Sequence, residues 1–220
     1  MKKFKCYGAA GILLALLFII FTICAALVDV AAVGPLDSMV GFSTVNKAAH
    51  DAVGTSDLFY EFSELLGLIS LGAVGAFGIL GLVQLTQRKS LRRVDTDLWV
   101  LCAFYAVVAI AYVLFEVLVI NYRPVLTDGV LEPSYPSSHT LLSVCMMSAT
   151  AMQLYRRIHK PIWRALSVGA AILIPTLTVA FRFLSGVHWL TDILGGLLLS
   201  ASLVCLYAAA LRWLDARSQQ

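Results

Sequence analysis

Charged residues are scarce in this sequence and are not spread evenly along it. Only 13% of the 220 residues are Asp, Glu, Lys or Arg, whereas 60% are hydrophobic. A soluble domain of this length needs more charge on its surface, so the composition excludes an ordinary soluble protein and favours a membrane protein. No internal repeat with a period of about 20–50 residues is visible, which argues against a solenoid.

Cysteine is also infrequent, and its pattern excludes two classes of small protein. The five cysteines lie singly in or beside apolar segments, at Cys6, Cys24, Cys102, Cys145 and Cys205. This is neither the close Cys/His spacing of a zinc site nor the framework of a disulfide-rich secreted domain. We interpret these cysteines as small lipid-facing or packing residues.

The sequence is rich in apolar segments long enough to cross a bilayer, which takes roughly 20 helical residues. Six segments of this kind are found, near 8–29, 62–86, 98–120, 139–155, 165–185 and 189–211. They predict an all-α fold, a bundle of six transmembrane helices in a single domain over residues 1–220.

The positions of the basic residues predict how this bundle is oriented. Lysine and arginine gather on the cytoplasmic side of membrane proteins. Here they lie before the first segment, between the second and third, between the fourth and fifth, and after the sixth; the three exceptions are Lys47, Arg123 and Arg182. We therefore expect both termini in the cytoplasm and the functional site at the outer face. The net charge of +3 follows this membrane pattern, so we expect no nucleic-acid partner.

The first outer loop, residues 30–61, has two interpretations. Phe42, Val45 and Ala49 recur at helical spacing, which predicts a short amphipathic helix on the outer surface. The alternative is a loop that only spans the gap between the first two helices.

Ionisable residues interrupt the apolar sequence between residues 181 and 196. This stretch contains Arg182, His188 and Asp192. Ionisable groups at membrane depth are candidates for a functional site. A spacing of four places His188 and Asp192 on one helix face, where the carboxylate can accept a proton from one ring nitrogen and leave the other free to attack.

The second outer loop adds anion-binding groups. It contains Arg123-Pro124 and ends with Pro136-Ser137-Ser138-His139. The serines predict a helix start, whose backbone amides favour an anion, and each arginine can contact two phosphate oxygens. Together with His188 this set fits phosphoryl transfer. The alternative is a buried polar cluster that only joins helices.

These three segments resemble the signature of the type 2 phosphatidic-acid phosphatase family, which are integral-membrane lipid phosphatases. The family motifs are Lys, six residues, Arg-Pro; then Pro-Ser-Gly-His; then Ser-Arg, five residues, His, three residues, Asp. This sequence has Arg123-Pro124, Pro136-Ser137-Ser138-His139, and Arg182, His188 and Asp192 in the same order.

The resemblance implies a role for each matching residue. His188 would be the nucleophile, Asp192 would hold its ring, and His139 would be the general acid. The phosphate would be bound by Arg123, Arg182, Ser137 and the backbone amides of Ser138 and His139. We expect no metal and no cofactor, because the arginines supply the positive charge.

The sequence departs from the family motifs at three positions. Glu116 stands where the motif has lysine, Ser138 replaces the glycine, and Phe181 replaces the serine before Arg182. Our hypothesis is that Glu116 positions Arg123 or another arginine, or contacts a cationic headgroup. We interpret Glu61 and Glu64, near the outer start of the second helix, as boundary residues.

The resemblance also implies the substrate class. Candidates are undecaprenyl diphosphate, phosphatidylglycerol phosphate, phosphatidic acid and diacylglycerol pyrophosphate. The basic cytoplasmic loops and the compact length are themselves typical of a bacterial plasma-membrane protein. Two other functions stay open: a transferase that passes the phosphoryl group to another lipid or sugar, and a non-catalytic protein that binds or transports lipid phosphates.

Overall fold

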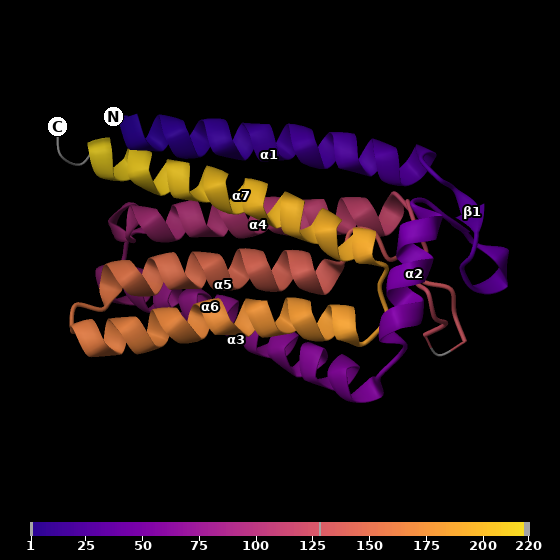
Figure 1. The fold of residues 1–220 in the computed structure, drawn as a ribbon. Helices are drawn as coiled ribbons and strands as arrows, with labels where there is room; N and C mark the ends of the chain where they lie inside the picture. The colour runs from indigo at the N-terminus through magenta and orange to yellow at the C-terminus, as the bar shows by residue number, and fades with distance from the viewer. Residues whose placement is uncertain (1, 128, 218–220) are drawn as a thin grey trace.

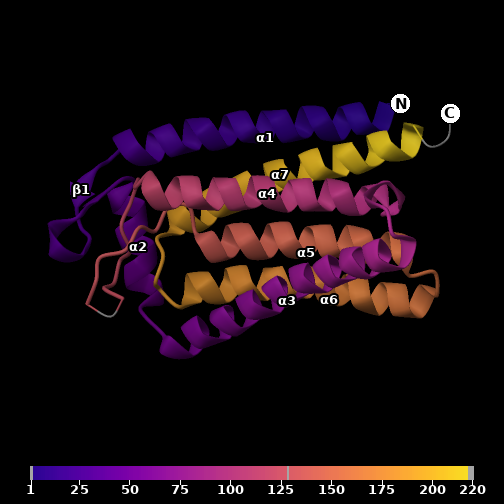
Figure 2. The ribbon, with the colours of Figure 1, turned by 180° about the vertical axis from the view of Figure 1, so that it is seen from behind.

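The computed structural model describes residues 2–127 and 129–217 as a bundle of long α-helices, which confirms the predicted all-α fold. The two ends of the predicted domain, residue 1 and residues 218–220, lie outside the described part. The helices are α1 (Lys2–Leu27), α2 (Ser43–Val53), α3 (Asp57–Arg88), α4 (Thr96–Val117), α5 (Ser138–Arg157), α6 (Pro161–Leu184) and α7 (Leu190–Arg217). All except α2 run along one common direction (Figures 1 and 2).

Five of these helices are long and apolar enough to cross a membrane, namely α1, α3, α4, α6 and α7. Large apolar side chains remain exposed on their outward faces, including Ile12, Leu68 and Ile110. A surface of this kind would aggregate in water, but lipid chains can cover it.

Helix α5 corresponds to the fourth predicted segment, near 139–155, and it differs in composition from the other five because of its central place. It packs against α3, α4, α6 and α7, and it buries polar side chains that lipid would not tolerate. Gln153 donates to the Tyr207 hydroxyl at 2.8 Å, and Ser143 donates to Thr178 at 3.2 Å. Hydrogen bonds inside the bundle therefore replace contact with lipid.

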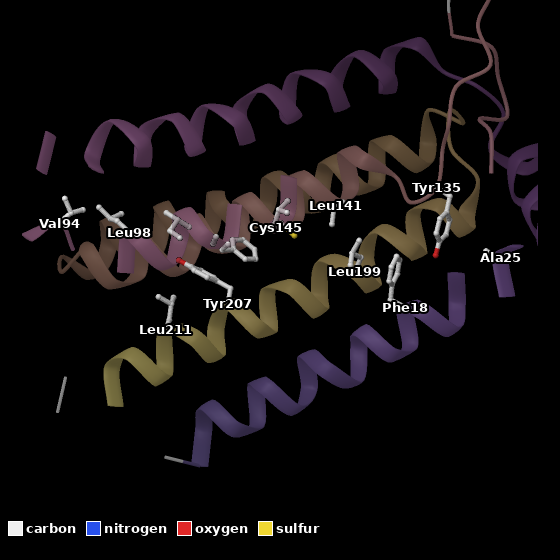
Figure 3. Close-up of a cluster of buried hydrophobic side chains, with 14 residues drawn as sticks. Phe18, Ala25, Val94, Leu98, Tyr135, Leu141, Cys145, Leu199, Tyr207 and Leu211 are labelled. Atoms are coloured by element: carbon white, nitrogen blue, oxygen red, sulfur yellow. The ribbon is translucent and has the colours of Figure 1, made fainter. Parts of the chain in front are cut away.

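A buried apolar cluster joins α1, α4, α5 and α7 (Figure 3). Phe18 of α1 stacks on Tyr135, and Phe104 of α4 stacks on Tyr207 of α7 with ring centroids 4.6 Å apart. Tyr135 is almost completely buried in the segment that leads into α5. The core thereby fixes the position of that segment.

The end of the bundle that carries both termini is held by ion pairs. Arg157 of α5 contacts Asp97 of α4 at 2.9 and 3.0 Å, and Arg156 contacts Asp215 of α7 at 2.8 and 2.9 Å. Before α4, the side-chain hydrogen bond from Arg88 lowers the pKa of Asp95. These contacts join four helices at the end where the predicted cytoplasmic loops lie (Figure 1).

The first loop does contain a short helix, so the interpretation of a plain loop is wrong. Helix α2 crosses the end of the bundle where α6 ends and α7 begins (Figure 1). It follows a hairpin of β1 (Ala31–Ala32) and β2 (Met39–Val40) that encloses the 3-10 turn η1 (Pro35–Asp37). A second 3-10 turn, η2 (Leu91–Arg93), precedes α4. Asn46 of α2 donates to Thr191 at 2.8 Å and accepts from the Thr191 amide, so α2 is bound to the start of α7.

A substitution at Gly41 tests how tightly the loop before α2 packs against the end of α1. A Cβ added at Gly41 would clash with the carbonyl oxygen of Ala25, which is backbone and cannot move aside. We expect Gly41→Ala to lower the free energy of unfolding by about 1–3 kcal/mol through overpacking. The measurement is thermal unfolding of the purified protein in detergent. Gly72→Ala in α3 is the control, since a Cβ there meets nothing within 4 Å; equal unfolding temperatures of the two variants would contradict this packing.

Candidate functional site

Three segments from two separate parts of the chain meet at the end of the bundle opposite the termini. They are the loop from α4 to α5, the first turn of α5, and the connection from α6 to α7. The last connection is short because Gly186 turns it with a positive φ of 67°, and a Cβ there would clash with the carbonyl oxygen of Gly54. The amide of Ser56 also donates to the Ser185 carbonyl at 3.1 Å. The connection is thus held against the link between α2 and α3.

His188 and Asp192 form the most buried pair in this region. Nδ1 of His188 lies 3.5 Å from Oδ2 of Asp192, and both side chains are at most 1% exposed. Asp192 is fixed by the Trp189 amide, which donates at 2.9 Å, and by the Asn121 side chain at 3.5 Å. His188 lies in the connection before α7, so the prediction that both residues share one helix face is wrong. The two side chains are nevertheless neighbours, although their contact lacks hydrogen-bond geometry.

The environment of His188 favours the neutral imidazole. Burial lowers the pKa of His188 well below its usual value, and the positive charges of Arg182 and Arg123 lower it further. The Ser134 backbone lies beside the ring, yet neither Nδ1 nor Nε2 has a partner with hydrogen-bond geometry among the described residues. A neutral ring carries a lone pair on one of its two nitrogens, so it is the form that can act as a nucleophile.

Arg182 is a fully buried guanidinium at the end of α6. It donates to Ser63 at 3.0 Å and to Glu64 at 2.9 Å, both on α3, and to Nδ1 of His139 at 2.5 Å. Its guanidinium carbon also lies 5.0 Å from the centre of the Tyr60 ring. Arg182 therefore connects α3, α5 and α6 at the site.

His139 lies between Arg182 and Glu64 in the first turn of α5. A guanidinium can only donate, so Nδ1 of His139 must accept, and the ring proton is assigned to Nε2. Nε2 lies 3.2 Å from Oε1 of Glu64. His139 thus presents an N–H group that a substrate oxygen could take over from the carboxylate.

Arg123 is held by the loop in which it lies. Its guanidinium is 3.2 Å from Glu132 and 3.3 Å from Thr127, and its side chain is only 12% exposed. Its charge acts on both Arg182 and His188, which places it in the same cluster. The Nε atoms of Arg123 and Arg182 are buried and have no hydrogen-bond partner in the described part of the chain.

The two serines of the second motif lie in different environments. Ser137 is completely buried and caps α5, because its hydroxyl accepts from the Thr140 amide at 3.5 Å. Its own amide donates to the Asp192 carbonyl at 2.9 Å, which joins the starts of α5 and α7. Ser138 begins α5 and lines a small cavity together with Glu116.

Glu116 does not position Arg123 as we had hypothesised. It is exposed in the last turn of α4, beside the Tyr112 hydroxyl, and it forms no ion pair with an arginine among residues 2–127 and 129–217. Arg123 pairs with Glu132 instead, because the loop folds back and the Arg123 amide donates to the Glu132 carbonyl at 3.0 Å. The other part of the hypothesis, a contact between Glu116 and a cationic headgroup, stays a prediction.

Two acidic residues belong to the site although the sequence did not assign them to it. Glu64 contacts Arg182 and His139, so its interpretation as a boundary residue is wrong. Glu132 balances Arg123 in the same way. The carboxylate of Glu64 inside an apolar segment was a signal in the sequence that could have marked it as a site residue. Its partners could not be recognised in this way, because they lie more than 70 residues away along the chain.

The comparisons with known proteins concern both the sequence and the fold. The sequence profile of the PAP2 superfamily matches residues 98–216. The fold is similar to the crystal structure of a transmembrane PAP2-type phosphatidylglycerolphosphate phosphatase from Bacillus subtilis, with a TM-score of 0.63, 18% identity, and coverage of 94% of this chain and 96% of that chain. No curated protein matches the sequence.

Glu64 provides a test of whether this end of the bundle binds an anion. Glu64→Gln keeps the side-chain volume but removes a negative charge beside Arg182. We expect inorganic phosphate to bind roughly fivefold more tightly, the effect of the ~1 kcal/mol with which two unit charges 4 Å apart interact in water. The dissociation constant can be measured from the rise in unfolding temperature with phosphate concentration.

Glu61→Gln is the matched control, because Glu61 is exposed on the same turn region of α3 and has no contact with Arg182 or His139 among the described residues. We expect the control to bind phosphate as the unchanged protein does. Equal affinities in all three proteins would contradict an anion site at Arg182.

Proposed function

Because the chain belongs to the PAP2 superfamily, as the three motifs predicted, we propose that it hydrolyses the terminal phosphate of a membrane lipid. The family match and the several apolar helices make it a multi-pass membrane protein. The observation that carries the proposed chemistry is the pair of His188 and Asp192, in which a buried neutral imidazole lies beside a carboxylate and is subject to the charges of two arginines.

In the first half-reaction Nε2 of His188 attacks the terminal phosphorus. The bond from phosphorus to the lipid oxygen breaks as the new P–N bond forms, and that oxygen takes the proton from Nε2 of His139. For this step His139 is an imidazolium, which forms when the bound phosphate draws Arg182 away from Nδ1, and loss of the Nε2 proton leaves a neutral ring. Nδ1 of His188 becomes more acidic as the ring acquires positive charge, and Asp192 stabilises this charge through its Oδ2 atom.

In the second half-reaction water attacks the phosphohistidine. His139, now without its Nε2 proton, accepts a proton from the water, the P–N bond breaks, and inorganic phosphate leaves. Both rings thereby return to their starting protonation states, so the cycle consumes only lipid phosphate and water.

The phosphate oxygens would be held by Arg123, Arg182, Ser137, and the amides of Ser138 and His139 at the start of α5. The unpartnered Nε atoms of the two arginines and the dipole of α5 support this assignment. These groups stabilise the charge that builds on the equatorial oxygens of the transferred group.

Glu64 also affects which nitrogen of His139 carries the proton in the proposed mechanism. In the ligand-free arrangement its carboxylate oxygen accepts from both Arg182 and His139. A leaving oxygen must replace it at Nε2 of His139, since that nitrogen carries one proton. We therefore assign Glu64 as a positioning residue that holds His139 in the donor tautomer until substrate enters.

The proposed topology has six transmembrane helices, with α5 enclosed by the others, both termini in the cytoplasm, and the site at the outer face of the plasma membrane. The concentration of basic residues at the end of the bundle with the termini supports this orientation. The substrate would then be a lipid in the outer half of the bilayer. Undecaprenyl diphosphate, phosphatidylglycerol phosphate and phosphatidic acid are the candidates.

The decisive experiment follows release of labelled phosphate from these three lipids in the presence of a chelator. We expect the unchanged protein to release free phosphate and to form an acid-labile phosphohistidine, and His188→Asn to lose activity by at least about 10³-fold, as when a covalent nucleophile is removed. Label transferred to an added alcohol in place of water would indicate the transferase. Undiminished phosphate release by the His188→Asn variant would contradict a catalytic role of His188.

His50→Asn is the matched control for this substitution. His50 lies in α2 and packs against the Trp189 ring, with centroids 5.5 Å apart, so it is close to the site but outside the proposed chemistry. We expect this variant to retain most of the activity.

Glu116→Lys tests whether the departure from the family motif sets substrate preference. Glu116 is exposed and forms no ion pair within the described chain, so its replacement breaks no such contact. We expect a lower KM for phosphatidic acid, because a carboxylate near the phosphate site is replaced by a cation. Glu61→Lys makes the same charge change on α3 and serves as the control; an unchanged KM in Glu116→Lys would remove Glu116 from substrate selection.

A further inference from the structure

The end of the bundle opposite the candidate site contains a second cavity with basic walls. Its volume is about 580 Å³, which is in the range of small-molecule sites. It is formed by α1, α5, α6, α7 and the connection from α5 to α6, at the end where both termini lie (Figure 1). We propose that this cavity binds the phosphate headgroup of an anionic glycerophospholipid.

Three arginines and one histidine line this cavity: Arg156, Arg164, Arg212 and His159. Arg156 is fixed and neutralised by its two contacts with Asp215. Arg164 lies over the Tyr155 ring, 4.8 Å from its centroid, an arrangement that orients the guanidinium without neutralising it. Within the described residues neither Arg164 nor Arg212 has a carboxylate partner. Two positive charges are therefore available for a ligand.

The remaining wall of the cavity is apolar, and this favours a lipid over a soluble anion. Tyr7 of α1, Met152 of α5, Val168 of α6 and Leu211 of α7 lie beside the basic groups. Outside the cavity the next turns of α6 expose Ile162, Trp163 and Leu166, each at least 60% exposed. A phosphate bound by Arg164 and Arg212 would have its glycerol and first acyl carbons against these apolar surfaces.

The position of the cavity indicates what a bound lipid would do. It is lined by side chains of α1, α5, α6 and α7. A ligand that binds only to the folded protein raises its stability by mass action. The lipid would act as a bridge between α6 and α7, which both pack on α5. This site is independent of the phosphatase chemistry, since none of its residues belongs to the candidate functional site at the opposite end of the bundle.

The experiment measures the unfolding temperature of the purified protein in detergent with added phosphatidylglycerol or phosphatidylcholine. We expect phosphatidylglycerol to raise the unfolding temperature by several degrees more than phosphatidylcholine. The variant Arg164→Gln/Arg212→Gln should lose this difference. Val168→Trp should lose it too, because the larger ring fills the cavity while all the charges remain.

The matched control is Arg92→Gln/Arg93→Gln, which removes the same charge from η2 at the same end of the bundle but outside the cavity. It should keep the full difference between the two lipids. A difference of the same size in all variants, or none in the unchanged protein, overturns the proposal. An equal rise with glycerol 3-phosphate alone would show a soluble-phosphate site and overturn the lipid as occupant. If the double variant does not fold, Arg212→Gln on the exposed end of α7 replaces it.

Discussion

The buried guanidinium of Arg182 is the constraint on which the end of the bundle opposite the termini depends. A charge that is completely buried must be paired and hydrogen-bonded, because an unpaired one would destabilise the fold by several kcal/mol. The partners come from two other helices, with Ser63 and Glu64 on α3 and His139 on α5. The requirement to satisfy one arginine therefore brings three helices together and places the proposed acid beside the proposed phosphate ligand.

The same principle accounts for the connection to the nucleophile. Asp192 is buried beside His188 and accepts from the Trp189 amide, while its carbonyl accepts from Ser137. The start of α7 is thus tied to the cap of α5, so the two histidines are held by one hydrogen-bonded framework. Preorganisation of this kind is what an electrostatic mechanism of phosphoryl transfer needs.

The two ends of the bundle use charge differently. At the end opposite the termini each arginine has one glutamate, Arg182 with Glu64 and Arg123 with Glu132, and the nearby His188 is kept neutral. This balance allows the arginines to remain buried before any phosphate arrives. At the other end Arg156 and Arg157 join helices through Asp215, Asp95 and Asp97. Arg164 and Arg212, which have no carboxylate partner among the described residues, line a cavity there.

The helices, the family and the motif residues could be predicted from the sequence, because they depend on local properties. Apolar length defines the long helices, and the spacing of Arg182, His188 and Asp192 is preserved along one stretch of chain. The interpretation of α2 stayed open because a short amphipathic pattern does not distinguish a helix from a loop. Helix α2 forms because Asn46 finds its partners on α7, a contact between residues far apart in sequence.

The sequence by itself determined which residues could carry the chemistry, since the motif types and their spacing lie within short segments. Only the tertiary structure decided which charges meet. Glu64 belongs to the site and Glu116 does not pair with Arg123, because the crossing of α3 over α5 and α6 and the fold of the second loop set those distances. Pairing between charges on different helices depends on how the helices pack, and local sequence carries no record of that geometry.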